Sequence, residues 1–179
     1  VAKASAQPLL VWGGLVLSTS LIIWLLITNT PKGEGGSRWY LLWILMSLIG
    51  GVYQYKYNQL RSVPDSIVSR TIGYMWGVFG ISVFVLWAIN ICAITFGGIS
   101  VRQVIPMTPT IILLMGLSVA VTGLMMNRLF ISIIGAVACA ICAYFSLVNQ
   151  GVNELLCVAV TAVFTLIVPG LYLKFSNGR

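Results

Sequence analysis

Six long runs of apolar residues constrain the fold of this chain more than any other feature. They cover residues 9–28, 39–57, 71–96, 109–126, 129–148 and 155–175. About 20 apolar residues in a helix cross the roughly 30 Å of a bilayer core. None of the runs alternates polar and apolar residues as a membrane barrel strand does. The runs therefore predict an all-α polytopic membrane protein, a bundle of six transmembrane helices forming a single domain over residues 1–179.

The scarcity of charged residues supports a lipid environment. Charged residues make up 7% of the chain and hydrophobic residues 59%, whereas a soluble domain carries about 25% charged residues. The first run is also longer than the apolar part of a signal peptide, and no small-residue cleavage site follows it. We therefore expect the first run to be a membrane span. The chain begins at Val1 without a methionine, so we expect a longer protein with a further N-terminal segment.

The basic residues predict how the helices are oriented, because lysine and arginine gather in cytoplasmic loops. Three of them would lie outside: Lys32, Arg38 and Arg102. Seven would lie inside: Lys3, Lys56, Arg61, Arg70, Arg128, Lys174 and Arg179. Both termini are therefore predicted to be cytoplasmic. Lys56, Arg61, Arg70, Arg128 and Lys174 are predicted to contact anionic lipid headgroups, and this membrane role accounts for the basic charge without nucleic-acid binding.

Small residues predict where helices approach each other closely in lipid. Gly73, Gly77 and Gly80 follow one another in the third run, and Ala136 and Ala140 are spaced by four in the fifth. These five residues are candidates either for packing within the chain or for a homodimer face. In the sixth run, Pro169 removes a backbone donor and predicts a kink. Asn127 and Arg128 alone separate the fourth and fifth runs, which predicts a tight helical hairpin.

Polar residues inside the membrane are the default candidates for function. Here they carry no charge, and the candidate contacts are Asn90, Ser82, Gln54, Thr122 and Thr161. Serine and threonine often return a hydrogen bond to their own helix. Asn90 is the most conspicuous of the five, and the sequence leaves open whether it bonds another helix or a ligand.

The residues needed for catalysis are too few and too scattered. The chain has no histidine, and Glu34 and Glu154 are predicted to lie on the opposite side of the membrane from Asp65. Cys139 and Cys142 lie within an apolar run without a nearby charge to stabilise a thiolate. We therefore expect no catalytic residues, no metal site and no cofactor.

Four stretches also resemble a known family. They are LLVWGGLV at 9–16, YLLWILM at 40–46 followed by Gly50-Gly51, YMWGVFG at 74–80, and VPGLY at 168–172. In this order they resemble an uncharacterised family of six-helix inner-membrane proteins from Bacteroidota. The resemblance implies a bacterial inner-membrane location and a short acidic cytoplasmic segment before the first helix. It implies no activity, because the family has none established.

Two classes of function remain from the sequence. The first is a non-enzymatic membrane protein that binds a partner, senses a membrane state or regulates another protein. The second is a small-solute transporter or channel component, since three plus three helices suit an inverted repeat. A transporter should have a water-accessible cavity near the midplane, lined by Asn90, Ser82, Thr122 or Thr161.

Overall fold

The computed structural model describes residues 2–31, 36–60, 67–98, 100 and 104–175, and in these residues every regular element is helical. The elements are α1 (Ala2–Asn29), the 3₁₀ helix η1 (Gly36–Leu41), α2 (Leu42–Leu60), α3 (Ile67–Thr95), α4 (Met107–Met125), α5 (Leu129–Val148), α6 (Glu154–Ala162), the π-helical segment η2 (Val163–Ile167) and α7 (Val168–Phe175). The last three form one continuous rod. The predicted all-α class is confirmed for the described residues.

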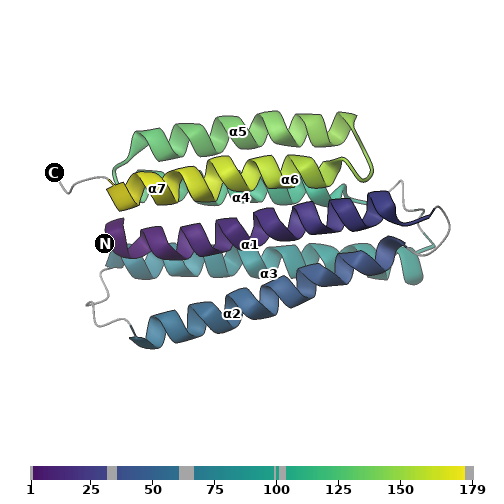
Figure 1. Ribbon diagram of the computed structural model, residues 1–179, viewed down its shortest axis with the longest axis horizontal. Coiled ribbons are helices and arrows are strands. Elements are labelled where there is room, and N and C mark those ends of the chain that lie inside the picture. The colour runs from purple at the N-terminus through teal and green to yellow at the C-terminus, as the bar shows by residue number, and fades with distance from the viewer. Residues whose placement is uncertain (1, 32–35, 61–66, 99, 101–103, 176–179) are drawn as a thin grey trace.

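The helices run side by side and alternate in direction (Figure 1). The start of α1 and the end of α7 lie at the same end of the bundle, which we call the terminal end. The turn between α5 and α6 lies at the other end, which we call the distal end, together with the end of α1 and the start of α4. This arrangement follows from short connections between consecutive helices, which favour antiparallel neighbours.

Five of the six predicted spans fall on helices that are long and apolar enough to cross a membrane. These are the parts of the helices over Ala6–Asn29, Arg70–Thr95, Met107–Met125, Leu129–Val148 and Glu154–Phe175. The second predicted span, 39–57, is the exception. Its first residues belong to η1 rather than to an α-helix, and the last third of α2 carries Gln54, Lys56 and Asn58, which lower its mean hydropathy.

The hairpin of α4 and α5 forms one half of the core, and glycines bring the two backbones together. A Cβ on Gly123 would lie 2.6 Å from both the backbone nitrogen and the Oγ of Ser132, and a Cβ on Gly135 would lie 2.7 Å from Val119 Cγ1. A Cβ on Gly116 would collide with Cys139. An approach this close increases the dispersion attraction between the two helices.

The turn of this hairpin is closed by its own backbone. Asn127 adopts φ +54°, the left-handed conformation that asparagine tolerates better than most residues. This lets the N–H of Asn127 bond the carbonyl of Leu124 at 2.9 Å and the N–H of Arg128 bond that of Gly123 at 2.8 Å. The pair satisfies carbonyls left open where a helix ends. The tight hairpin predicted at Asn127-Arg128 is confirmed.

The rod of α6, η2 and α7 forms the other half of the core by packing against α1. A Cβ on Gly13 would lie 2.8 Å from Ile167 Cγ1 and 2.9 Å from Leu166 Cβ, and a Cβ on Gly170 would lie 2.9 Å from Leu10 Cγ. The neighbouring Gly14 has nothing within 4 Å of its Cβ position. One glycine of the pair thus faces the rod, because successive helical residues point about 100° apart.

A π-helical segment stands directly before Pro169, where the sequence predicts a kink. Proline has no N–H to bond the carbonyl four residues earlier and its ring crowds that carbonyl. Over Val163–Ile167 the backbone widens, and the N–H of Val168 reaches back to the carbonyl of Val163. Proline thus acts on this helix through an inserted π turn.

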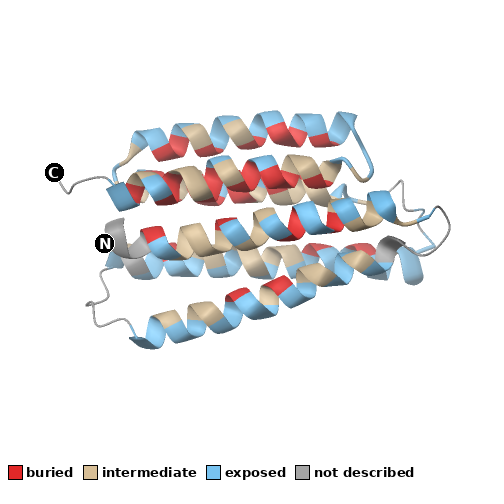
Figure 2. Ribbon diagram, viewed as in Figure 1, coloured by how far each residue is buried: buried red, intermediate tan, exposed pale blue. Residues whose placement is uncertain are grey.

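Most residues of α2 and α3 are exposed (Figure 2). In α3, 6% of the residues in the apolar window are buried, against 50% in the window that ends the chain. On α2 only Met46 and Gly50 are buried. Gly50 allows α2 to pack closely on α1, because a Cβ there would lie 2.5 Å from the ring of Trp12.

Candidate functional site

The five polar residues singled out from the sequence do not gather at one place. Thr122 and Thr161 are buried, and each hydroxyl donates to the carbonyl four residues earlier, that of Ser118 and that of Cys157, both at 2.7 Å. Ser82 is half-buried on α3. These hydroxyls thus lie along three helices, two of them satisfied by their own backbone.

Asn90 and Gln54 make contacts that join separate segments. The Asn90 amide is buried and donates to the carbonyl of Ile105 at 3.0 Å, which ties α3 to the segment just before α4. The Gln54 carbonyl oxygen accepts a 3.4 Å bond from the Trp12 indole, and its amide nitrogen donates to Asn58 at 3.0 Å. Both residues therefore serve contacts within the chain.

Replacing Asn90 with leucine is expected to lower the free energy of unfolding by about 1 kcal/mol, because the Ile105 carbonyl loses its buried donor. Asn149→Leu is the matched control, since the exposed Asn149 amide, just past the end of α5, donates among the described residues to the nearby carbonyl of Phe145. Thermal unfolding of both variants in the same detergent measures the difference. Equal losses of unfolding free energy in Asn90→Leu and Asn149→Leu would contradict a stabilising link between α3 and the start of α4.

The small residues proposed as a packing or dimer face point away from the bundle. Gly73, Gly77 and Gly80 have nothing within 4 Å of their Cβ positions, and Ala136 and Ala140 are exposed on α5. The side of α5 that packs on α4 and on the last rod is the adjoining one, with Ser132, Gly135, Cys139 and Ala143 buried. The five candidates are therefore available to something outside the chain.

The basic residues predicted to meet lipid headgroups lie where helices end. Lys56 belongs to the last turns of α2, Arg70 to the start of α3, Arg128 to the α4–α5 turn and Lys174 to the end of α7. All four of these positions are at the terminal end of the bundle (Figure 1). Arg61 lies outside the described residues, as do Lys32, Glu34, Asp65, Arg102 and Arg179.

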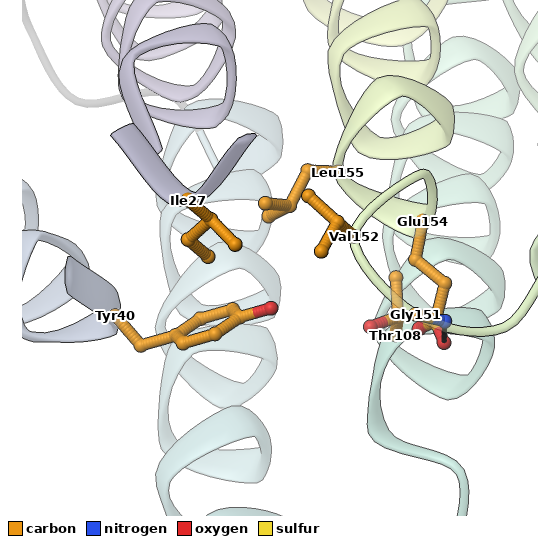
Figure 3. Close-up of a pocket in the computed structure, with 7 residues that line it drawn as sticks. All are labelled: Ile27, Tyr40, Thr108, Gly151, Val152, Glu154 and Leu155. Atoms are coloured by element: carbon orange, nitrogen blue, oxygen red, sulfur yellow. Dashed lines mark hydrogen bonds between the residues drawn. The ribbon is translucent and has the colours of Figure 1, made fainter. Parts of the chain in front are cut away.

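A cavity of about 340 Å³ opens at the distal end of the bundle (Figure 3). The end of α1, η1, the start of α4 and the α5–α6 turn contribute its lining: Ile27, Tyr40, Thr108, Gly151, Val152, Glu154 and Leu155. The Tyr40 ring reaches in from one side, while Thr108 and Glu154 lie together on the other. Glu154 accepts a 2.9 Å hydrogen bond from the N–H of Gly151.

Sequence reasoning missed this cavity. From the sequence, Glu154 was predicted only to lie on the opposite side of the membrane from Asp65, and Tyr40 entered only as the first residue of the YLLWILM stretch. These two residues are more than a hundred positions apart in the chain, so no motif connects them. The available signal was only that Glu154 starts a helix and that both residues lie at the same predicted membrane face.

A second hollow lies inside the bundle, at the meeting of α1, α3, α4, α5 and the last rod. Thr122 and Thr165 supply its hydroxyls among apolar side chains that include Trp76 and Leu173. It has about 0 Å³ of space for a water-sized sphere. The helices are thus closely packed around Thr122.

No protein-family model, curated protein or solved structure matches this chain.

Proposed function

We propose that this protein crosses the inner membrane of a bacterium six times, with both termini in the cytoplasm. Five helices have the required length and apolarity, and η1 with α2 would supply the sixth passage. The ends of α1 and α7 that carry the termini share one end of the bundle, as an even number of passages requires. The basic residues at that end support a cytoplasmic orientation. The resemblance to the Bacteroidota family supports the bacterial location.

Within that membrane we propose a non-enzymatic role: the protein binds a partner, and through it has a sensory or regulatory effect. One observation carries this proposal, the outward face of α3. It is the least buried of the five apolar helices, and it presents Gly73, Gly77 and Gly80 with open space over each. Glycine contributes little to contact with lipid tails, but it allows another helix to approach closely.

The alternative of a small-solute transporter or channel component has less support. Its path would need water-sized space beside the buried polar residues, whereas the hollow lined by Thr122 has about 0 Å³ of such space. The hydroxyls of Thr122 and Thr161 also donate their hydrogen bonds to carbonyls of their own helices. Binding of a partner on the outer surface requires no such path.

The test is association of the full-length protein in mild detergent or lipid nanodiscs. Gly77→Leu should lower the yield of a cross-linked homodimer or of a co-purifying membrane protein at least about fivefold, because a leucine would hold the partner helix away. Val137→Leu is the matched control, since Val137 is exposed on α5 and remains bulky. A purely monomeric wild-type protein with no co-purifying partner would overturn the proposal. So would equal association of Gly77→Leu and wild type.

A further inference from the structure

The distal cavity has walls of two chemical kinds. Ile27, Val152 and Leu155 line it with aliphatic carbon, whereas Tyr40, Thr108 and Glu154 bring oxygen atoms to it. In Figure 3 the Tyr40 hydroxyl points inward from one side, and the Thr108 and Glu154 side chains lie opposite it. A mainly apolar cavity with a few polar groups is typical of a small-molecule site, and about 340 Å³ is at the lower end of the usual size range.

Glu154 gives this cavity a negative charge that no cation of the described chain neutralises. No described lysine or arginine forms an ion pair with it, and among the described residues its carboxylate accepts a hydrogen bond only from the N–H of Gly151. The guanidinium of Arg38, which belongs to the same 3₁₀ helix as Tyr40, instead lies over the Trp39 ring at 5.0 Å. A carboxylate has about four acceptor positions, so Glu154 retains capacity for a donor that enters from the cavity.

The ligand that fits these walls is a cation with several N–H donors and an apolar remainder. A primary ammonium has three donors, and the cavity has acceptor oxygens on Glu154, Tyr40 and Thr108. A quaternary ammonium has no donor to use them and prefers a cage of several aromatic rings, while this lining has the single ring of Tyr40. A hydrogen bond from an ammonium to a carboxylate is charge-assisted, and such bonds are stronger than those between neutral groups.

We propose that the distal cavity binds the primary ammonium group of an amphiphile, with Glu154 as its anionic partner. The cavity lies where the apolar parts of α1, α4 and the last rod end, which is the depth at which a lipid headgroup would meet the protein. A phospholipid with an ethanolamine headgroup and a free alkylamine share this chemistry. The aliphatic walls formed by Ile27, Val152 and Leu155 accept the methylene groups next to the ammonium.

Native mass spectrometry of the detergent-solubilised protein tests the proposal by titration with phosphatidylethanolamine. Phosphatidylcholine with the same acyl chains is the lipid comparison, since methylation removes the N–H donors but keeps the charge. Wild type is expected to bind the ethanolamine lipid at least about tenfold more tightly than the choline lipid. Glu154→Gln should lower affinity for the ethanolamine lipid by about tenfold or more, the scale of a lost hydrogen bond to a charged group.

Two further variants separate this site from general lipid contact. Thr108→Val removes a hydroxyl from the cavity and should weaken ethanolamine-lipid binding severalfold. Thr110→Val removes a hydroxyl that donates to the Pro106 carbonyl at 2.7 Å on the same first turn of α4, and it should leave binding unchanged. If Glu154→Gln fails to fold, the Thr108→Val comparison and the two-lipid comparison in wild type still decide the question.

The source of the ammonium is decided by competition. Displacement of the lipid by n-butylamine at low concentration would assign the site to a free amine, whereas displacement only by ethanolamine lipids would assign it to the membrane. Equal wild-type affinity for the two lipids would overturn the proposal. Unchanged binding in Glu154→Gln would do the same.

Discussion

Gly123→Ala is expected to lower the free energy of unfolding by about 2 kcal/mol, the usual cost of overpacking a close contact. The new Cβ would lie 2.6 Å from the backbone nitrogen of Ser132 and 3.1 Å from the carbonyl oxygen of Arg128. Backbone atoms cannot move aside by a rotamer change, so α5 must shift as a whole. That shift would also strain the hydrogen bond from the Ser132 hydroxyl to the Ala120 carbonyl. Thermal unfolding in detergent should show a melting point lower by about 4–8 °C.

Gly51→Ala on α2 is the matched control for this change, because Gly51 lies outside the proposed partner-binding face. It replaces the same residue type by the same residue within a long helix, and nothing lies within 4 Å of the new methyl group. Both variants gain the higher helix propensity of alanine, so the difference between them isolates the packing contact. Gly51→Ala should unfold at the wild-type temperature or slightly above it. Equal behaviour of the two variants would contradict the close α4–α5 approach.

Gly13→Leu is expected to lower the free energy of unfolding by about 3 kcal/mol, at the upper end of overpacking costs. Its Cβ would meet Leu166 and Ile167 at less than 3 Å, with the backbone nitrogen of Ile167 at 3.3 Å. This is the π-helical segment, whose backbone is already widened ahead of Pro169. The variant should aggregate after extraction or melt at least several degrees below wild type. Gel filtration and thermal unfolding measure both outcomes.

Gly14→Leu is the matched control, because it places the same side chain on the adjacent glycine, which faces away from the last rod. Gly14 has open space over it, so a leucine there should be tolerated with a change within about 0.5 kcal/mol, as for most surface substitutions. The two variants have identical composition and differ only in which face of α1 carries the bulk. A Gly14→Leu variant as unstable as Gly13→Leu would contradict the described orientation of α1.

Periodicity and length were sufficient to predict most of the helices. The fifth predicted run, 129–148, coincides with α5, because turn residues delimit it on both sides. The first run, 9–28, is the apolar part of a longer helix, since α1 begins at Ala2, where polar residues are as compatible with a helix as apolar ones. The second run lies largely on α2, which is long enough at 19 residues, but the polar last third of that helix lowers its mean hydropathy below that of the five apolar helices. Hydropathy indicates where a helix can contact lipid, and it does not indicate where the hydrogen-bonded helix stops.

The sequence predicts less well which face of each helix packs against its neighbours. In lipid the inward and outward sides of a helix are both apolar, so the amphipathic signal that orients a helix in water is weak. Ala136 and Gly135 are adjacent small residues on α5, and only Gly135 lies against α4. The same holds for Gly13 and Gly14 on α1. A small residue indicates that a close approach is possible, without saying to what.

One candidate site could be recognised from the sequence, and the other could not. Asn90 was recognisable from the sequence because an amide inside an apolar run needs a partner, but the partner, the Ile105 carbonyl, depends on how α3 meets α4. The distal cavity was not recognisable, since Tyr40 and Glu154 become neighbours only when η1 and α6 are brought to one end of the bundle.

The amino-acid sequence by itself determined the helical class, the approximate helix positions and the tight turn at Asn127-Arg128. Each of these depends on local properties, namely the number of consecutive apolar residues and the conformations that asparagine and proline allow. Only the tertiary structure decided that Gly13, Gly116, Gly123 and Gly135 serve the core while Gly73, Gly77 and Gly80 face outward. It also decided that a π-helical segment precedes Pro169 and that a carboxylate faces an apolar cavity. These features depend on contacts between distant segments, and in a uniformly apolar chain close packing, not hydrophobicity, selects among such contacts.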